Sequence, residues 1–267
     1  MAATRENPII FYDLVGVDGD SWSPNPYKTR SDELDRLTLN HKGLPYRIEY
    51  IAFPDIEPRL KGLGVAPVSD THPRYTLPVI ADPSNDPSGK PTYVSDSFKI
   101  ALYLDDKYPA PKYPAIFSSG TRSLQDLLVI QYIPTIYAHI TPIIMPKMLH
   151  LLDARSAEYI QRHRPEKFKA LPDDLAAGKW ADAREKFVAL HKSVELNDGT
   201  KDAGPFITGN IVSFIDLALG SLFYWIRKVE GEDSPHLKEM LEWQGGRWNR
   251  LWQAIQEIEN QSSRVDE

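Results

Sequence analysis

Proline is distributed unevenly along the chain, and this constrains the fold more than any other feature of the sequence. Fifteen of the 22 prolines precede Ala115, and only seven lie in the 153 residues from there onward. Proline lacks a backbone N–H and interrupts both helices and strands. The first part of the chain must therefore consist of short elements joined by many turns, whereas the second part can form long helices.

The pattern of apolar residues in the first part predicts a mixed α/β domain. Strands are predicted where β-branched and aromatic residues cluster or alternate with polar ones, over residues 8–14, 45–52, 75–81 and 91–94. Helices are predicted where apolar residues recur every three or four positions, over residues 26–41, about 57–63, and 97–108. The resulting order is β-α-β-α-β-β-α, in which the last two strands form a hairpin.

The second part of the chain predicts an all-helical domain. Its helices are expected over residues 121–152, 156–163, 180–196, 213–229 and 235–258. In the last of these, Trp248 and Trp252 belong to an apolar stripe that predicts core packing. The proline-rich segment 107–120 connects the two parts. We therefore expect an α/β domain over residues 1–110 and a helical-bundle domain over residues 120–267.

Composition excludes several kinds of chemistry. The chain contains no cysteine, so it cannot form a disulfide framework, a thiolate zinc site, a cysteine-bound iron–sulfur cluster or a protein thiol nucleophile. Its seven histidines show no close pair at ligand spacing, so no metal site is expected. With 31 basic and 37 acidic residues the net charge is −6, which argues against nucleic acid as a partner.

One segment must be tested for membrane insertion, because residues 127–146 contain no Asp, Glu, Lys or Arg. The same segment contains Pro134, Pro142 and Pro146, which would leave backbone groups unsatisfied in lipid. A kinked helix in a protein core is therefore expected, and no membrane partner. The N-terminal residues lack an apolar core, so no secretory signal is expected. Together these features predict a cytoplasmic protein.

Three short stretches could carry chemistry, and each also has a purely structural interpretation. Ser23 and Asn25 precede the first helix, where the helix dipole stabilises an anion, yet either residue could simply cap that helix. Pro78 interrupts a predicted strand, which indicates an edge, a bulge or a cis peptide. Asp96 and Ser97 precede another helix and could hold an ammonium and a carboxylate group, or serve only as caps.

In a β-α-β-α-β-β-α unit these stretches lie at one end of the sheet, and five motifs in this order resemble the glutathione transferases over nearly the full chain. They are Trp22–Arg30, Asn40–Tyr46, Leu77-Pro78, Asp96-Ser97 and Ser213–Asp216. Residues 23–25 and 155–159 are most similar to the fungal-specific class A, etherase-like transferases. The resemblance implies a thioredoxin-like domain followed by a helical domain, a homodimer, and detoxification chemistry on xenobiotics.

The resemblance also implies roles in binding glutathione, the co-substrate. Ser23 would hydrogen-bond its sulfur and move the thiol pKa from about 8.5 to below neutral, so that the thiolate attacks an electrophile. Leu77 would bind the cysteinyl part through its backbone, and Asp96 and Ser97 would hold the γ-glutamyl part. The cofactor-binding set is Asn25, Leu77, Pro78, Asp96 and Ser97.

Two further roles follow from the resemblance. A pocket for hydrophobic aromatic substrates would lie between the domains, lined by Trp22, Tyr132, Ile136, Tyr137 and Met145. Ser213 and Asp216 would form a capping box at the start of a core helix, with a structural role.

Several alternatives stay open within this family. Ser21 or Asn25 could replace Ser23 as the donor to sulfur, because the preceding loop is long. His41, Lys42 and Lys61 are candidates to hold the glycyl carboxylate of glutathione. Tyr12 resembles the tyrosine of other transferase classes, although inward packing is favoured for it.

The reaction is also open. Aryl ethers, phenolic compounds and generic electrophiles all suit an aromatic pocket, and a non-catalytic carrier of aromatic ligands would need the same pocket. A hydrolase is disfavoured, because Gly19–Ser23 lacks the closing glycine of a nucleophile elbow and the second half of the chain is helical.

Overall fold

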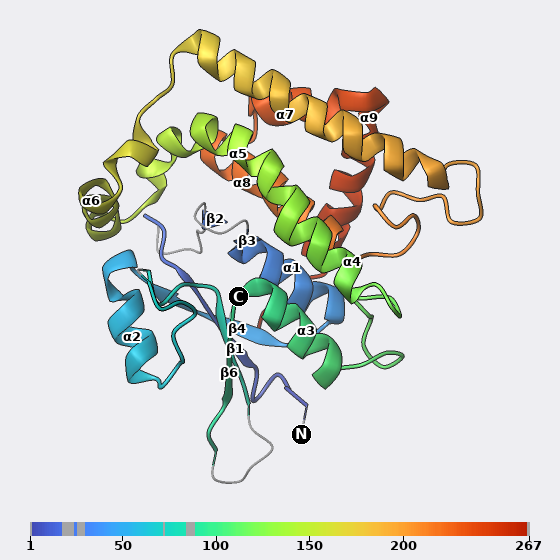
Figure 1. The fold of residues 1–267 in the computed structure, drawn as a ribbon. Coiled ribbons are helices and arrows are strands. Elements are labelled where there is room, and N and C mark those ends of the chain that lie inside the picture. The colour runs from blue at the N-terminus through green and yellow to red at the C-terminus, as the bar shows by residue number, and fades with distance from the viewer. Residues whose placement is uncertain (1, 18–23, 26–29, 72, 84–88, 266–267) are drawn as a thin grey trace.

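The structure is a computed structural model that describes residues 2–17, 24–25, 30–71, 73–83 and 89–265. Figure 1 shows a helical domain stacked on a domain that contains a sheet. The fold class predicted from the sequence, an α/β domain followed by an all-helical domain, is confirmed.

The N-terminal domain is built on a four-stranded sheet. Its strands are β1 (Ile9–Leu14), β4 (Tyr46–Ile51), β5 (Val79–Asp82) and β6 (Thr92–Ser95), in the spatial order β4-β1-β5-β6. β1 runs parallel to β4 and antiparallel to β5, and β6 forms a hairpin with β5. Because a parallel pair needs a crossover connection, the helix α1 (Asp32–Lys42) lies between β1 and β4 in the chain.

Helices cover both faces of this sheet, as Figure 1 shows. α1 and α3 (Ser97–Lys107) lie on one face, and α2 (Ile56–Gly62), which follows the 3-10 turn η1 (Phe53–Asp55), lies on the other. Successive side chains of a strand point to opposite faces. Phe11 accordingly packs with α1 and α3, whereas Tyr12 packs with α2.

In the N-terminal domain, two boundaries differ by several residues from the prediction. The first helix begins at Asp32 rather than at residue 26, because residues 30–31 form the short strand β3 (Arg30–Ser31), which pairs with β2 (Pro24–Asn25). Residues 26–29 lie outside the described residues. The third predicted strand begins at Val79 rather than at residue 75, since Pro78 has no N–H to donate to a neighbouring strand.

The helical domain follows in chain order. Its helices are α4 (Arg122–Leu127), α5 (Ile133–Ile144), α6 (Ala154–His163), α7 (Asp173–Val194), α8 (Phe214–Glu230) and α9 (Pro235–Asn260). A π-helical turn, η2 (Leu128–Tyr132), and the 3-10 turns η3 (Met145–Leu151), η4 (Pro165–Phe168) and η5 (Glu195–Asn197) lie between them. α8 is the central helix, buried along most of its length and packed against α1, α5 and α9.

The predicted helix over residues 121–152 is a series of segments rather than one helix. Pro142 lies inside α5, and Pro146 lies at the start of η3. In the described part of the chain, Arg122–Leu151 is the one helical stretch that is long and apolar enough to cross a membrane by length and composition. Its residues Ile140 and Ile144 are buried in the core of the helical domain, as predicted for a kinked core helix.

α9 is interrupted in its middle, which the apolar spacing did not predict. Gln244, Gly245 and Gly246 have φ angles of 49°, 67° and 76°. Glycine enters this left-handed region without a steric penalty, so the glycine pair permits the kink. Trp248 and Trp252, which follow the kink, are buried as predicted.

The C-terminal segment returns to the N-terminal domain. The N–H of Tyr46 donates to the carbonyl of Ser263 at 3.4 Å, and the N–H of Val265 donates to the carbonyl of Tyr46 at 2.9 Å. Arg36 of α1 forms an ion pair with Glu259 of α9. These contacts pair the outer edge of β4 with the C-terminal segment and tie the two domains together.

Candidate functional site

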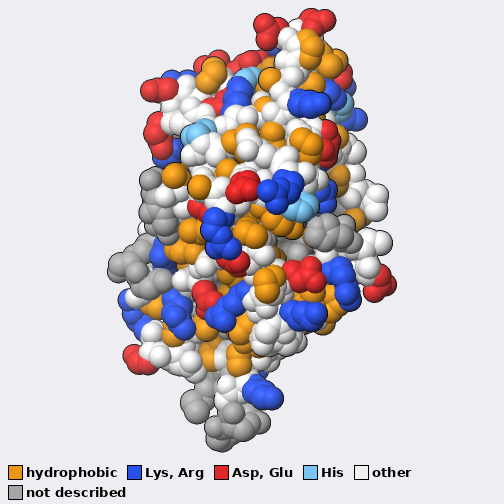
Figure 2. Space-filling model, turned by 90° about the vertical axis from the view of Figure 1, so that its left-hand side faces the viewer, with side chains coloured by type: hydrophobic (Ala, Val, Ile, Leu, Met, Phe, Trp, Pro, Cys, Tyr) orange, Lys and Arg blue, Asp and Glu red, His pale blue; other side chains and the backbone are white. Residues whose placement is uncertain are grey.

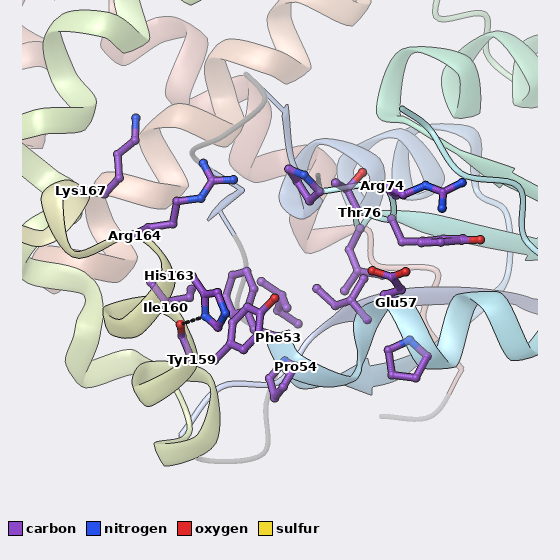
Figure 3. A pocket seen from close by; sticks show the side chains of 16 residues that line it. Phe53, Pro54, Glu57, Arg74, Thr76, Tyr159, Ile160, His163, Arg164 and Lys167 are labelled. Atoms are coloured by element: carbon purple, nitrogen blue, oxygen red, sulfur yellow. Dashed lines mark hydrogen bonds between the residues drawn. The ribbon is translucent and has the colours of Figure 1, made fainter. Parts of the chain in front are cut away.

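A cavity of about 530 Å³ lies between the two domains (Figure 3). On the side of the N-terminal domain it is lined by Leu14, by residues of η1 and the start of α2, and by residues 73–77. On the side of the helical domain it is lined by residues of α6 and η4. Figure 2 views this face of the molecule, where hydrophobic side chains are bordered by charged ones.

The pairing of β5 with β6 brings the predicted binding residues together. Val79 is the register partner of Ser95 in this antiparallel pair, so Leu77, two residues earlier, lies opposite the start of α3. Leu77 lines the cavity, and the peptide between Leu77 and Pro78 is cis. Leu77, Pro78, Asp96 and Ser97 therefore form one group, of which Leu77 lines the cavity.

Ser97 carries a buried hydroxyl group. Ser97 is 0% exposed, and its Oγ has no hydrogen-bond partner among the described residues. An unsatisfied buried polar group costs about 1–3 kcal/mol. A ligand carboxylate that accepted a hydrogen bond from this hydroxyl would remove that cost.

Asp96 holds an unusual backbone conformation at the start of α3. Its φ angle is 83°, in the region that favours glycine. Its Oδ1 accepts hydrogen bonds from the N–H groups of Phe98 at 3.1 Å and Lys99 at 3.2 Å, so it caps the helix. The capping interpretation of Asp96 is thus correct, and backbone outliers of this kind cluster at ligand sites.

The start of α6 is clamped onto the N-terminal domain. Arg155 donates to both carboxylate oxygens of Asp55 at 2.8 Å, and Ser156 Oγ accepts a hydrogen bond from the N–H of Phe53 at 3.0 Å. Asp153 caps α6 by accepting from the N–H groups of Arg155 and Ser156. Because η1 and α6 both line the cavity, this clamp sets the separation of its two walls.

Two aromatic rings of α6 line the cavity next to η1. Tyr159 and His163 lie one turn apart, with ring centroids separated by 4.2 Å. His163 Nδ1 donates to the carbonyl of Tyr159 at 2.7 Å, which leaves Nε2 as the ring nitrogen that can reach a ligand. Figure 3 shows both side chains on the same side as Phe53 and Pro54, opposite Arg74, Thr76 and Glu57.

The charges of the cavity wall are predominantly positive. Among the described residues, Arg74, Arg164 and Lys167 line it together with one carboxylate, that of Glu57. The chain as a whole has a net charge of −6. The described part of the cavity lining therefore carries three basic side chains and one acidic side chain, although the chain as a whole is acidic.

Several predicted site residues lie elsewhere or cannot be placed. Ser23 and Trp22 lie outside the described residues, and Asn25 is described only as part of β2. The structure places the other predicted pocket residues, Tyr132, Ile136, Tyr137 and Met145, in the packing of the helical domain.

None of these four residues is among the described residues that line the cavity. The reason is that the apolar face of α5 and its neighbours packs against α7 and α8. Tyr132 donates its hydroxyl to the carbonyl of Lys186 on α7 at 2.6 Å, and Tyr137 stacks on Trp225 of α8. Ile136 and Met145 are buried in the same core. The cavity takes its apolar surface from η1 and α6 instead.

The open alternatives can also be located. Tyr12 is 2% exposed, and burial, followed by the nearby Glu49 carboxylate, raises its pKa to about 12. It packs inward, as predicted. Lys42 is ion-paired with Asp105 at 2.8 Å inside the protein, so it is unsuited to hold a ligand carboxylate. His41 faces the carbonyl of Ala115, and neither it nor Lys61 is among the described residues that line the cavity.

The predicted capping box is present. Asp216 accepts hydrogen bonds from the N–H of Ser213 at 2.9 Å and from the N–H of Ile207 at 2.6 Å. Burial raises the pKa of Asp216 to about 6 despite these bonds. Its role is structural, as the sequence indicated. Among the described residues there is no group of three His, Asp or Glu side chains that could hold a metal ion.

Sequence reasoning missed the cavity wall itself. Phe53, Arg74, His163, Arg164 and Lys167 were not singled out, although the segment 155–159 was. The basic run over residues 162–167 was the available signal. It could not be distinguished from a solvated helix end without knowing that α6 packs against η1.

Comparison with known proteins identifies the same two domains. Residues 36–107 match the family "Glutathione S-transferase, N-terminal domain". Residues 123–257 match the family "Glutathione S-transferase, C-terminal domain". The glutathione S-transferase-like protein ustS of Aspergillus flavus is 30% identical, with 98% of this chain and 95% of that protein covered.

Solved structures show the same likeness. A glutathione S-transferase of Ceriporiopsis subvermispora, solved in complex with glutathione, is 31% identical with a TM-score of 0.80, covering 95% of this chain and 98% of that one. The glutathione transferase GSTFuA3 from Phanerochaete chrysosporium is 30% identical with a TM-score of 0.78, covering 94% and 97%. The predicted likeness to the fungal transferases is confirmed.

Proposed function

Because this chain belongs to the glutathione transferase family, we propose that it is a serine-type enzyme, which activates the thiol of glutathione for attack on an aromatic or phenolic electrophile or an aryl ether. The observation that carries the proposal is the buried Ser97 hydroxyl, which is unpartnered among the described residues and lies opposite Leu77, a residue of the interdomain cavity lining. Glutathione supplies the reactive sulfur that a chain without cysteine lacks.

The γ-glutamyl end of glutathione is proposed to lie at the start of α3. Its carboxylate would accept a hydrogen bond from Ser97 Oγ at the positive end of this 11-residue helix. Asp96 would face the ammonium group. The cysteinyl part would lie along the backbone of Leu77, beside Pro78.

Arg74 is proposed to hold the glycyl carboxylate. With the cysteinyl part at Leu77 and the γ-glutamyl part at Ser97, the glycyl end extends in the opposite direction along residues 73–76, and Arg74 lines the cavity there. Arg74 replaces the earlier candidates His41, Lys42 and Lys61, which face other parts of the structure or lie off the cavity wall.

Ser23 is proposed as the donor to the glutathione sulfur. The residue after it, Pro24, pairs in β2 with Ser31, which directly precedes α1. This pairing supports a position for Ser23 near the N-terminus of α1, where the helix dipole stabilises a thiolate. Asn25 and Ser21 are the alternative donors. The thiolate would form a C–S bond to the electrophile, and the leaving group, a phenolate in the case of an aryl ether, departs with its electron pair.

Titration with glutathione tests the binding half of the proposal. We expect Ser97→Ala to raise the dissociation constant of glutathione about tenfold, because the lost hydrogen bond is to a charged carboxylate. Ser119→Ala, on an exposed segment, serves as the control. If Ser97→Ala binds glutathione as tightly as the wild type, Ser97 does not hold the γ-glutamyl carboxylate.

Turnover with 1-chloro-2,4-dinitrobenzene tests the catalytic half. Ser23→Ala should lower kcat and the ultraviolet absorbance of the bound thiolate while leaving glutathione affinity nearly unchanged. If Ser23→Ala has no effect on either, Ser23 does not contact the sulfur. If the wild-type protein binds glutathione and aromatic compounds without turnover, it is a ligand carrier instead.

We also propose a cytoplasmic homodimer. The side chains of Leu124 and Leu127 are 55% and 56% exposed on α4, one turn apart. Apolar side chains exposed together support a protein interface more than isolated ones do. The family is mostly soluble, which supports the cytoplasm.

A further inference from the structure

We infer that the second substrate carries a phenolic hydroxyl, and that His163 selects it by accepting a hydrogen bond from this hydroxyl at Nε2. This role deepens the proposed function and rests on it, since it identifies the class of compound that meets the glutathione thiolate. His163 belongs to the wall of the cavity that the helical domain supplies.

One face of α6 forms this wall. Ser156 and Ile160 lie about one turn apart and are buried, and Ser156 Oγ accepts a hydrogen bond from the N–H of Phe53 on η1. Residues three and four positions apart share a helix face, so Tyr159 and His163 lie beside this buried pair. Both of these side chains therefore line the cavity next to Phe53, as Figure 3 shows.

A hydrogen bond within α6 determines which nitrogen of His163 can accept from a ligand. Nδ1 lies 2.7 Å from the carbonyl oxygen of Tyr159 (Figure 3), and a carbonyl oxygen only accepts, so Nδ1 carries the proton. A neutral imidazole has one donor and one acceptor nitrogen, so Nε2 is the acceptor. No described residue donates to it. The cavity therefore offers an acceptor that a ligand hydroxyl can satisfy.

Apolar and aromatic side chains lie around this acceptor. The ring centroids of Tyr159 and His163 are 4.2 Å apart, and Phe53 and Pro54 of η1 lie on the same side of the cavity. The ring of an aromatic substrate packs favourably against such surfaces. A phenol combines this ring with a donor for Nε2, whereas an aryl methyl ether has the ring without the donor.

The other polar groups of the lining do not make the same selection. Glu57 and Arg74 lie on the opposite wall, where the glycyl end of glutathione is proposed to bind. Arg164 and Lys167, which follow His163, each have an interaction partner in the structure already.

The hydroxyl of Tyr159 is the other polar group on the aromatic side of the cavity. A tyrosine hydroxyl both donates and accepts, so it can bind the oxygen of a phenol or of an ether. A neutral imidazole nitrogen that only accepts can bind the phenol alone. His163 is therefore the residue that distinguishes the two compounds.

The substrate hydroxyl takes no part in bond making. With 3-hydroxybenzyl chloride, the thiolate of glutathione forms a C–S bond at the benzylic carbon, and chloride leaves with the electron pair of the C–Cl bond. The phenolic O–H bond stays intact. The contact with His163 is present before and during the reaction, so its loss should raise KM and leave kcat unchanged.

The binding experiment uses 3-phenylphenol and its methyl ether, titrated into the glutathione-loaded protein in a calorimeter. We expect the phenol to bind about fivefold more tightly than the ether. His163→Phe keeps a ring beside Tyr159 but removes both nitrogens, so phenol and ether should then bind within about twofold of each other. His163→Gln, whose side-chain oxygen can accept a hydrogen bond, should retain part of the preference.

Two further variants provide the controls. His150 also donates from Nδ1 to a nearby carbonyl, that of Lys147 at 2.6 Å, but it is exposed and is not among the described residues that line the cavity. His150→Phe should therefore change neither affinity. Tyr159→Phe removes the neighbouring hydroxyl and should keep the preference for the phenol. If Tyr159→Phe loses the preference and His163→Phe keeps it, Tyr159 makes the selection and the inference is wrong.

Kinetics with 3-hydroxybenzyl chloride and 3-methoxybenzyl chloride provide the second readout. His163→Phe should raise KM for the hydroxyl compound about fivefold, with kcat and the KM values for the methoxy compound and glutathione within about twofold.

The outcomes separate this inference from the proposed function. Equal affinity for 3-phenylphenol and its methyl ether in the wild type overturns the inference, even if both chlorides react. If the preference for the phenol depends on His163 but neither chloride reacts, His163 selects phenols and the proposed catalytic function fails.

Discussion

A buried ion pair between Lys42 and Asp105 offers the strongest test of how this fold holds its two domains together. Lys42 Nζ donates to Asp105 at 2.8 Å and to the carbonyl of Pro114 at 2.9 Å, and the lysine residue is 2% exposed. Asp105 also accepts from the N–H groups of Ile116 and Phe117, so the pair anchors the connection between the domains. Burial lowers the pKa of Lys42, but the Asp105 carboxylate opposes this effect.

Replacing Lys42 with methionine keeps the apolar stem and removes only the charge. The Asp105 carboxylate then stays buried without its counter-ion, and breaking a buried pair in this way costs about 3–5 kcal/mol. Because two backbone N–H groups still solvate the carboxylate, we expect the lower end, about 3 kcal/mol. Urea unfolding followed by tryptophan fluorescence measures the change in the free energy of unfolding.

A matched control and a rescue sharpen this test. Lys61→Met removes an exposed lysine of α2 and should change the free energy of unfolding by less than about 0.5 kcal/mol. Lys42→Met combined with Asp105→Asn removes both charges, and it should recover part of the loss because no uncompensated charge remains. The reasoning is refuted if Lys42→Met is as stable as the wild type, or if the double variant is less stable than the sum of the single changes.

Two further predictions follow from other parts of the structure. Burial opposes ionisation of Glu230, but hydrogen bonds led by those from His236 and Lys147 outweigh it and lower its pKa to about 2. The folded pKa of Glu230 is thus below the unfolded value of 4.5, so ionised Glu230 stabilises the protein above that pH. About 3 kcal/mol of this stabilisation is lost as pH falls toward 2. Acid unfolding of Glu230→Gln should lack this component, and an unchanged acid profile would contradict the assignment. Separately, Leu124→Glu with Leu127→Glu should convert the proposed dimer to a monomer in sedimentation analysis, and a monomeric wild type would end that proposal.

Many local elements of both domains could be predicted from the sequence, since short-range spacing determines them. The alternation over residues 45–52, the helix after Ser97 and the capping box at Ser213 and Asp216 all appear as predicted. Capping, alternation and helical periodicity depend on neighbours a few residues away, which the sequence displays directly.

Which side chains line a substrate pocket depends on a different kind of information. Tyr132, Ile136, Tyr137 and Met145 lie on a hydrophobic helix face that the sequence shows well, but periodicity cannot tell whether that face covers a ligand or another helix. In the structure α7 and α8 cover it.

The sequence by itself determined the order of the elements, the absence of a protein thiol, and the group formed by Leu77, Pro78, Asp96 and Ser97. Those features depend on residue identity and on pairing between neighbouring strands. Only the tertiary structure decided that α6 packs against η1, through contacts between residues about 100 positions apart. That packing places Arg164 and Lys167 in the same cavity as Leu77 and Arg74, because long-range contacts, and not local spacing, determine which surfaces meet.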